Sequence, residues 1–351
     1  MASVETSLDS TVARSQLALE GLEEPLQVFT LGNRRGTQVQ LADLGASLLS
    51  VHTADRNGRR GNILLTYGDP SHWLDNSWFL GVTVGRVANR IGRARFPLGE
   101  GEVQLPVNDG ENHLHGGPQG LGTRRWSASP GPGAAVTFRC ESADGDGGYP
   151  GRVEAELTYR LSEEDELTLE YRARSDCRTP ISLTNHAYWN LAAGGSILDH
   201  ELQINAAQYL ELDSGLVPTG QLLNVDSTAL DFRRPKPIGR DIDRQPGGYD
   251  NYWVVERTGD KALKSIASLW DPLSGRRLEV ISSEPGVQFY SGNFLDGTRN
   301  RADGSPMAHR SGLCLETHGF PDAPNHSEFP SVMLEAGEEY RQTTIYRFSA
   351  K

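Results

Sequence analysis

The chain has 351 residues, of which 37% are apolar and 39 are glycines, and its 46 acidic and 34 basic side chains give a net charge of −12. A chain of this length buries roughly 75% of its unfolded surface on folding, and it has no apolar run near the roughly 18 residues of a membrane helix, so neither wholesale disorder nor a membrane span is expected. The acidic balance is the opposite of the basic surface that binds nucleic acid, and it also disfavours a strongly anionic polymer as substrate.

The N-terminal segment comes first along the chain. Met1–Glu5 lacks the basic and apolar stretches of a secretory signal peptide, and the three cysteines of the chain are too few and too widely spaced for a disulfide framework. Both features predict a cytoplasmic protein. Residues 6–22 have a weak helical periodicity, and we expect residues 1–24 to form an N-terminal extension to a single domain at 25–351.

His113 and His115 lie two residues apart, a spacing that puts both imidazoles on one face of a strand, as in the metal sites of double-stranded β-helix oxygenases. Those sites also take a carboxylate a few residues further on, and residues 118–122 contain none. We therefore expect no metal. The glycines at 116 and 117 instead allow a ligand or a backbone segment to approach His115 closely.

Apolar and polar residues alternate strictly over Val153–Leu161 and again over 167–174, with the polar turn Ser162–Asp165 between them. This period of two is typical of a β-hairpin with one solvated face. Asn-Gly and Asp-Gly turn signals are dense, and long amphipathic helical stretches are missing. The sequence therefore predicts an all-β protein, a single large antiparallel β-sandwich or barrel. Shorter alternations support this at Val136/Phe138/Cys140, Leu202/Ile204, Leu278/Val280 and Tyr346/Phe348.

The segment Ile181–Leu191 departs from the usual pattern of apolar and charged faces. If it is a strand, one face is mostly apolar, whereas the other carries only uncharged hydrogen-bonding groups and a histidine. Such a face is typical of the wall of a cleft for a neutral, polar ligand. A buried histidine that is satisfied by neighbouring hydroxyl groups is the alternative interpretation. The residues of the polar face are Ser182, Thr184, His186, Tyr188 and Asn190.

The segment Gly312–Asp322 places Glu316 in an unusual setting. Alternation puts it on one face of a strand with Cys314 and His318, next to a Gly/Pro turn. A carboxylate there is expected to be partly desolvated, and burial raises the pKa of a glutamate, which makes it a more useful base near neutral pH. The alternative is an ordinary surface glutamate at the end of a strand.

Five strings of the sequence occur in a distinctive order: Gly85–Gly92 (GRVANRIG), Leu114–Gly117 (LHGG), Asn185–Leu191 (NHAYWNL), Val287–Leu295 (VQFYSGNFL) and Leu315–Thr317 (LET). In this order they resemble the galactose mutarotases (aldose 1-epimerases), and the resemblance runs from about residue 25 to the C-terminus. Each string alone is only moderately specific, whereas five in order are strong evidence. The resemblance implies a large antiparallel β-sandwich, often called a supersandwich, with the sugar in an open cleft.

The resemblance also implies roles for particular residues. Glu316 matches the family's catalytic base and His186 its catalytic acid, and His115 matches a second histidine that hydrogen-bonds the sugar near the reacting centre. The residues that match those binding the sugar hydroxyls are Asn89, Arg90, Asp250 and Gln288.

The sequence departs from the family pattern at four positions. Asn251 stands where the family often has His, and His318 stands where it often has Gln. Ala187 and Trp189 replace the commoner Ser and Phe. None of these changes removes a catalytic group that the resemblance implies, and the first two bear on which sugar is preferred.

The implied reaction explains why these residue types are needed. Interconversion of α and β anomers requires removal of the proton from the C1 hydroxyl and protonation of the ring oxygen, followed by ring opening, rotation about C1–C2 and closure. A carboxylate base and an imidazolium acid suffice, each typically contributing roughly 10²–10⁴-fold. Histidine suits the acid because its ordinary pKa is about 6.5, and we expect the adjacent carboxylate to hold it protonated.

No hydride, acyl or phosphoryl group moves in this reaction, so the resemblance implies no cofactor. The expected partner is a free aldose such as galactose or glucose, with no nucleic acid and no membrane, and the expected state is a monomer or weak homodimer. Three alternatives remain open. A hexose-phosphate 1-epimerase would use Arg86 or Arg93 for the phosphate, a sugar-binding or sensing protein could lack the acid or the base, and a glycosidase would need a second carboxylate about 5–10 Å from Glu316.

Overall fold

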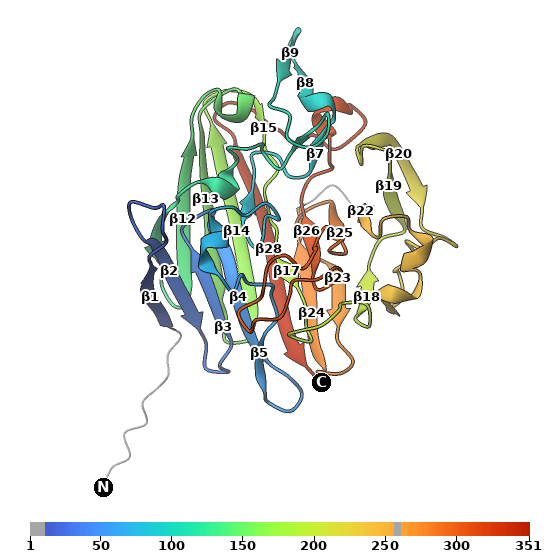
Figure 1. Cartoon of the computed structure of the whole chain (residues 1–351). Coiled ribbons are helices and arrows are strands. Elements are labelled where there is room, and N and C mark those ends of the chain that lie inside the picture. Colours follow the sequence, from blue (N-terminus) through green and yellow to red (C-terminus); the bar gives the residue numbers. More distant parts are fainter. Residues whose placement is uncertain (1–10, 256–260) are drawn as a thin grey trace.

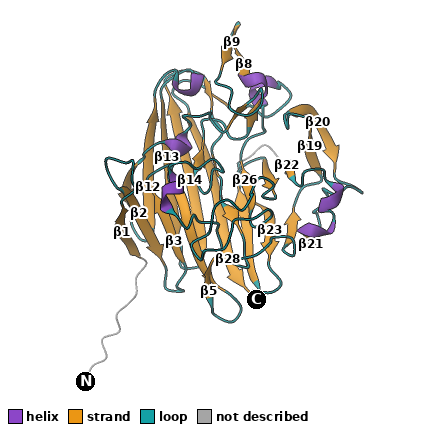
Figure 2. Cartoon of the chain, viewed as in Figure 1, coloured by secondary structure: helices purple, strands orange, loops and turns teal. Residues whose placement is uncertain are grey.

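The computed structural model describes residues 11–255 and 261–351, and strands dominate their regular structure (Figure 1, Figure 2). Every helical segment in these residues is a 3₁₀ turn of three or four residues, so the prediction of an all-β protein is confirmed. The turns are η1 (Pro70–Trp73), η2 (Gly92–Ala94), η3 (Leu121–Thr123), η4 (Asp146–Gly148), η5 (Ile238–Arg240), η6 (Ile242–Arg244) and η7 (Ala323–Asn325).

The largest sheet has nine antiparallel strands. The predicted hairpin forms two of them, and its alternation is reflected in burial, because Val153, Ala155 and Leu157 face the core while Glu154 is exposed. The shorter alternations that the sequence predicted also lie in strands of this sheet. In spatial order the strands are β11 (Ser127–Pro130), β12 (Ala135–Ser142), β13 (Val153–Leu161), β14 (Glu166–Ser175), β28 (Glu339–Ala350), β24 (Arg276–Ser282), β23 (Lys264–Trp270), β18 (Glu201–Ile204) and β21 (Lys236–Pro237).

Two further sheets pack against the same core and complete a β-sandwich. The five-stranded sheet consists of β1 (Thr11–Leu17), β2 (Leu26–Gly32), β3 (Gln38–Ala42), β4 (Ser47–Ala54) and β5 (Arg60–Asn62), in that order. The six-stranded sheet consists of β17 (Tyr188–Trp189), β26 (Leu313–Thr317), β25 (Gly286–Tyr290), β22 (Asp250–Val254), β19 (Gln208–Leu212) and β20 (Pro218–Asn224).

Aromatic contacts join the three sheets across the core. The rings of Phe29 in β2 and Phe138 in β12 meet edge to face with centroids 5.8 Å apart. The rings of Trp189 in β17 and Tyr346 in β28 lie 4.8 Å apart. Because such pairs add to the free energy gained by apolar burial, the nine-stranded sheet holds the other two sheets in place and so supports the strands that carry the candidate site.

Short ladders hold the loops that cover the six-stranded sheet. β7 (Arg90–Ile91) pairs with β10 (His113–Leu114), and β6 (Thr83–Val84) pairs with β16 (Thr184–Asn185). These two ladders bring the segments around residues 90, 115 and 186 together. The remaining ladders join β8 (Arg95–Leu98) to β9 (Gly101–Gln104) and β15 (Thr179–Pro180) to β27 (Met333–Leu334).

Two expectations about local structure need correction. Residues 11–17 form the strand β1, which pairs antiparallel with β2, so the weak helical periodicity over 6–22 is wrong for the described part of that segment. Residues 1–10 lie outside the described residues, and the domain boundary near residue 25 stays a prediction.

The segment Ile181–Leu191 is not one strand. It forms β16 and β17, with His186 in the break between them, and it is buried throughout.

Within the described ranges, no helix combines the length and the apolar character that a membrane crossing would require.

Candidate active site

Glu316 lies in the middle of β26 with 2% of its surface exposed. Its cross-strand neighbour is Gln288 in β25. Burial raises the pKa of the Glu316 carboxyl well above its usual value, the nearby Asp250 raises it further, and Arg90 lowers it in part. The second carboxylate oxygen, Oε2, has no hydrogen-bond partner among the described residues. The expectation of a desolvated carboxylate is therefore confirmed, and a buried acceptor is left for an incoming hydroxyl group.

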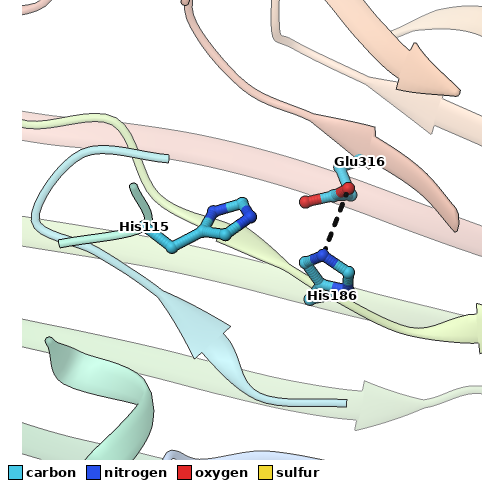
Figure 3. A group of neighbouring side chains, drawn as sticks. All are labelled: His115, His186 and Glu316. Carbon is cyan, nitrogen blue, oxygen red and sulfur yellow. Dashed lines mark ion pairs between the residues drawn. The ribbon is translucent and has the colours of Figure 1, made fainter. Parts of the chain in front are cut away.

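His186 faces Glu316 from the break between β16 and β17 (Figure 3). Its backbone N–H donates to the carbonyl of Val82 (2.9 Å), and its carbonyl accepts from the N–H of Gly81 (2.9 Å), which fixes the position of the side chain. The imidazole Nε2 lies 3.6 Å from Oε1 of Glu316. The other ring nitrogen, Nδ1, lies 3.5 Å from Sγ of Cys314.

The protonation of His186 differs from the expectation. Burial lowers the pKa of His186 to about 4, so the adjacent carboxylate does not hold the imidazole protonated at neutral pH. The pKa of Glu316 is shifted upwards by the same physical cause. Burial therefore favours the uncharged form of each group, the carboxylic acid of Glu316 and the neutral imidazole of His186. An acid/base pair needs one proton that can pass between its two side chains.

His115 completes the group that Figure 3 shows. Its ring meets that of His186 edge to face, with centroids 5.1 Å apart. The backbone N–H of Asn89 donates to Nδ1 of His115 (3.2 Å), so the proton of the neutral ring is on Nε2. Burial lowers the pKa of His115 well below its usual value. His115 is therefore a neutral ring that donates a hydrogen bond through Nε2.

The four residues implied to bind sugar hydroxyls lie around this group. Arg90 Nε contacts Oδ2 of Asp109 at 2.7 Å, and its NH1 lies 4.0 Å from Oδ2 of Asp250. Gln288 Nε2 donates to the other oxygen of Asp250 at 2.6 Å. Asn89 has a φ of +64° and accepts from the N–H of Arg90 through its own side chain. The structure thus brings together all seven residues that the resemblance implied.

Cavities open beside Arg90 and Asp250, although neither is lined by Glu316 or His186. Asp250 and Asn251 line a cavity of about 1160 Å³, and Arg90 lines another of about 930 Å³. Both cavities share Phe294 and Asp213. A concave space with a few convergent polar groups is the usual form of a small-molecule site.

The same group could be considered as a metal site, because donor atoms of His115, His186 and Glu316 all lie within 4.8 Å of one another. Two observations favour acid/base chemistry. His113, the expected second histidine of the His-x-His spacing, points elsewhere and contacts the carbonyl of Pro106 at 2.7 Å. In addition, the proton on Nε2 of His115 occupies the lone pair that a metal would need.

Sequence reasoning missed two contributors to this site. Phe79 adopts a φ of +57°, and its ring packs against both His115 (4.8 Å) and His186 (5.8 Å). A lone aromatic residue gives no sequence signal of such a conformation. Asp109, the partner of Arg90, begins an Asp-Gly turn, and a turn signal alone does not indicate a contact with a residue 19 positions earlier.

The structure also shows the surroundings of His318 and Asn251, the two departures from the family pattern that bear on sugar preference. His318 is fully buried, and its Nδ1 lies 2.6 Å from the carbonyl of Gly319, so Nδ1 carries the proton. Its Nε2 has no partner in the part of the chain that the structure describes. Asn251 accepts, through Oδ1, a long hydrogen bond (3.4 Å) from the backbone N–H of Asp250.

Comparison with known proteins agrees with the sequence strings. The family model for aldose 1-epimerase matches residues 27–347. Galactose mutarotase of Mus musculus is 40% identical over 314 residues, covering 89% of this chain and 91% of the relative. Aldose 1-epimerase of Escherichia coli (strain K12) is 39% identical over 336 residues, covering 93% and 96%.

Comparison with solved structures also finds aldose epimerases. The GalM/aldose epimerase homologue from C. elegans superposes with a TM-score of 0.84 at 28% identity, covering 97% of this chain and 99% of the other. Galactose 1-epimerase from Lactobacillus acidophilus NCFM has a TM-score of 0.84 at 27% identity, with the same coverage. The two structures therefore share the sandwich and its sheet arrangement with this chain.

Proposed function

The chain belongs to the aldose 1-epimerase family, and from this premise we propose that Glu316 and His186 make the proton transfers that interconvert the α and β anomers of a free aldose. The reaction is an isomerisation, and nothing is consumed in it. The observation that carries the proposal is the buried pair itself, with Nε2 of His186 and Oε1 of Glu316 3.6 Å apart.

The proton balance of the reaction fits this pair. The reaction proceeds from the charge-separated form of the pair, which is reached when the Glu316 carboxyl passes a proton to Nε2 of His186. The carboxylate then takes the proton of the C1 hydroxyl, and Nε2 gives its proton to the ring oxygen. The C1–O5 bond breaks, and C1 becomes the carbonyl carbon of an open-chain aldehyde. After rotation about C1–C2, the C5 hydroxyl attacks the other face of the carbonyl, its proton returns to His186, and Glu316 protonates O1. The pair ends with the single proton with which it began.

Burial gives each group the strength that its step requires. A carboxylate whose pKa is raised is a stronger base than an exposed one. An imidazolium whose pKa is lowered to about 4 is a stronger acid, and the ring oxygen of a sugar is a poor base that needs one. The desolvation that shifts both pKa values therefore makes the ionised carboxylate a stronger base and the imidazolium a stronger acid, while it lowers the population of this charged form.

The surrounding residues hold the sugar. Nε2–H of His115 is suited to donate to an oxygen at the reacting edge of the ring, since Nδ1 is already occupied by the N–H of Asn89. Arg90 and Asp250 offer charge-assisted hydrogen bonds to hydroxyl groups at the opposite edge. Asn89 and Gln288 are suited to the same role through their side-chain amides.

A free hexose suits this site better than a hexose phosphate. The guanidinium of Arg86, one of two arginines considered for a phosphate, is buried and donates to Ser142, Ala143 and Pro150. Its four hydrogen bonds hold it against the segment around residues 142–150, so of the two arginines Arg93 is the better candidate for a phosphate. A glycosidase is also disfavoured, because the second carboxylate near Glu316 is Asp250, which is bound by Gln288 and faces Arg90.

The expected partners are correspondingly few. We expect galactose and glucose as substrates, no nucleic acid, and a monomer or weak homodimer. Cytoplasmic location stays a prediction.

Polarimetry tests the proposal. Freshly dissolved α-D-galactose, α-D-glucose and glucose 6-phosphate are each followed with wild type, with Glu316→Gln and with buffer alone. We expect wild type to speed the approach to the same final rotation for the free sugars and Glu316→Gln to behave like buffer. The matched control is Glu338→Gln at an exposed position, which should behave like wild type. No acceleration by folded wild type, or acceleration only with the phosphate, would contradict the proposal.

A further inference from the structure

Cys314 contacts the proposed acid, and the mechanism above does not use it. It lies in β26 two residues before Glu316, on the same face of the strand, and is fully buried. Its cross-strand neighbour is Tyr188 in β17, which follows His186 by two residues. Sγ lies 3.5 Å from Nδ1 of His186, while Nε2 of that ring faces Glu316. The cysteine and the glutamate thus contact opposite nitrogens of one imidazole.

We propose that Cys314 is a positioning residue for the epimerase reaction, whose sulfur accepts the Nδ1–H of His186 and so keeps Nε2 as the nitrogen that exchanges the proton with the sugar. This inference rests on the proposed function, because it assigns a partner to the proposed acid. No covalent step and no oxidation of the sulfur is involved.

The ring packing around His186 shows why such a residue is needed. The ring lies between Phe79 and Tyr188, with interplanar angles of 32° and 31° and centroid distances of 5.8 and 5.1 Å. These two aromatic rings define the plane of the imidazole. They do not define its direction, because a half-turn about Cβ–Cγ keeps the plane and exchanges nitrogens for carbons. The polar contacts of the ring nitrogens, with Cys314 and with Glu316, distinguish the two orientations.

The chemistry of the thiol suits the task. Burial raises the pKa of the Cys314 thiol well above its usual value, and Glu316 raises it further, so the group stays uncharged. A neutral sulfur is a weak hydrogen-bond acceptor. It can orient Nδ1–H without stabilising the imidazolium strongly, whereas a carboxylate at this position would stabilise the imidazolium and weaken it as an acid.

The proton inventory agrees with this role. As imidazolium, His186 carries protons on both nitrogens, with Nδ1–H toward sulfur and Nε2–H toward the sugar. After Nε2 has given up its proton, the remaining proton is on Nδ1, where the sulfur accepts it. Nε2 then presents a lone pair to the same place and can take the proton back on ring closure. The same nitrogen therefore works in both directions.

Two substitutions separate positioning from packing. Cys314→Val preserves the approximate volume of the side chain but removes the hydrogen bond, whereas Cys314→Ser preserves a donor and acceptor. We expect Cys314→Val to lower kcat about tenfold through loss of ring orientation, with KM for galactose within about twofold of wild type. Cys314→Ser should keep kcat within about threefold. Equal kcat for Val and wild type, or equal losses for Val and Ser, would overturn the inference.

A spectroscopic measurement depends neither on turnover nor on the folding of the Cys314 variants. Nitrogen chemical shifts of ¹⁵N-histidine-labelled wild type distinguish the two neutral tautomers of His186, which is assigned by comparison with His186→Asn. We expect the proton on Nδ1 at neutral pH. A proton on Nε2 would overturn the inference even in an active enzyme. If wild type lacked epimerase activity but showed the Nδ1–H tautomer, the proposed function would fail while the contact between Cys314 and His186 would stand.

Discussion

The strands β13 and β26 have the same period of two and opposite consequences. In β13 the polar residues face water, and Glu154 and Glu156 are paired at 2.9 and 2.8 Å with the arginines Arg152 and Arg139. In β26 the polar residues face inward, and Glu316 is 2% exposed. Alternation alone therefore does not distinguish a solvated face from a reactive one. What differs is the covering, because the segment around His186 and the loops near Phe79 and Arg90 exclude water from β26.

The segments that cover β26 change the electrostatic environment of its glutamate more than they change the geometry of the strand. The carboxylates of β13 keep their hydration, so their ion pairs contribute little to stability. Two polar atoms, Oε2 of Glu316 in β26 and Nε2 of His318 directly after that strand, lack a hydrogen-bond partner among the described residues, whereas β13 has no such atom in that part of the chain. Unpartnered buried polar atoms reduce stability, and in an enzyme they are the atoms that a substrate can satisfy. β13 therefore contributes to the stability of the fold, whereas β26 contributes groups to the proposed reaction.

The largest effect expected from this comparison concerns the two glutamates. Glu316→Gln removes the proposed base and should lower kcat by roughly 10²–10⁴-fold, with the fold retained. Glu156→Gln on β13 is the matched control and should leave kcat unchanged, with a change in unfolding free energy below about 1 kcal/mol. Polarimetry and chemical denaturation measure both quantities. Similar kcat values for the two variants would remove the distinction between the strands.

For the core face of the hairpin we expect a loss of stability without a loss of activity. Leu157 in β13 is fully buried in the shared core, and Leu157→Ala should lower the unfolding free energy by about 2–5 kcal/mol through lost burial and a cavity. Since no residue of β13 is among the seven proposed site residues, kcat per folded molecule should be that of wild type. Urea denaturation and active-site titration test this. A loss of kcat in fully folded protein would show that the hairpin is coupled to the chemistry.

A smaller effect is expected at the rim of the site. Asp250→Asn removes the charge that faces Arg90 and holds Gln288 at 2.6 Å. We expect KM for galactose to rise about tenfold, the cost of one charge-assisted hydrogen bond, with kcat within a few-fold. The control is Asp303→Asn in an exposed loop. A loss confined to kcat would move Asp250 from binding to proton transfer.

The smallest effect expected is a change in the pH dependence of stability. Burial lowers the pKa of His318 to about 4 from the ordinary value of 6.5. Between these values the unfolded chain takes up a proton that the folded chain excludes, so stability falls as pH falls from 6.5 to 4. His115, His186 and His200 contribute with the same sign.

Removing one of these histidines tests the sign. In His318→Gln the unfolding free energy should fall less steeply over this range than in wild type, whereas the non-titrating change Thr158→Ser on β13 should leave the slope as it was. Urea denaturation at several pH values provides the comparison. An unchanged slope in His318→Gln would mean that this imidazole titrates normally in the fold.

Periodicity and turn signals were sufficient to predict the β class and most long strands, because an exposed hairpin such as β13–β14 follows local rules. The resemblance supplied the seven site residues, and the fold brings them together. The weak helical periodicity over 6–22 wrongly predicted a helix where β1 forms, because pairing with β2 overrides a weak local preference. The left-handed conformation of Phe79 and the low pKa of His186 depend on contacts between distant segments, which one sequence does not reveal.

A double-substitution cycle tests the central claim, that Glu316 and His186 act as one proton-transfer unit. The kcat/KM for galactose is measured for Glu316→Gln, His186→Asn and the double variant. Groups that act as a unit are strongly non-additive, so we predict that each single change costs roughly 10²–10⁴-fold and that the double variant is about as active as the worse single one. Losses that multiply, or near-normal activity in either single variant, would contradict the account.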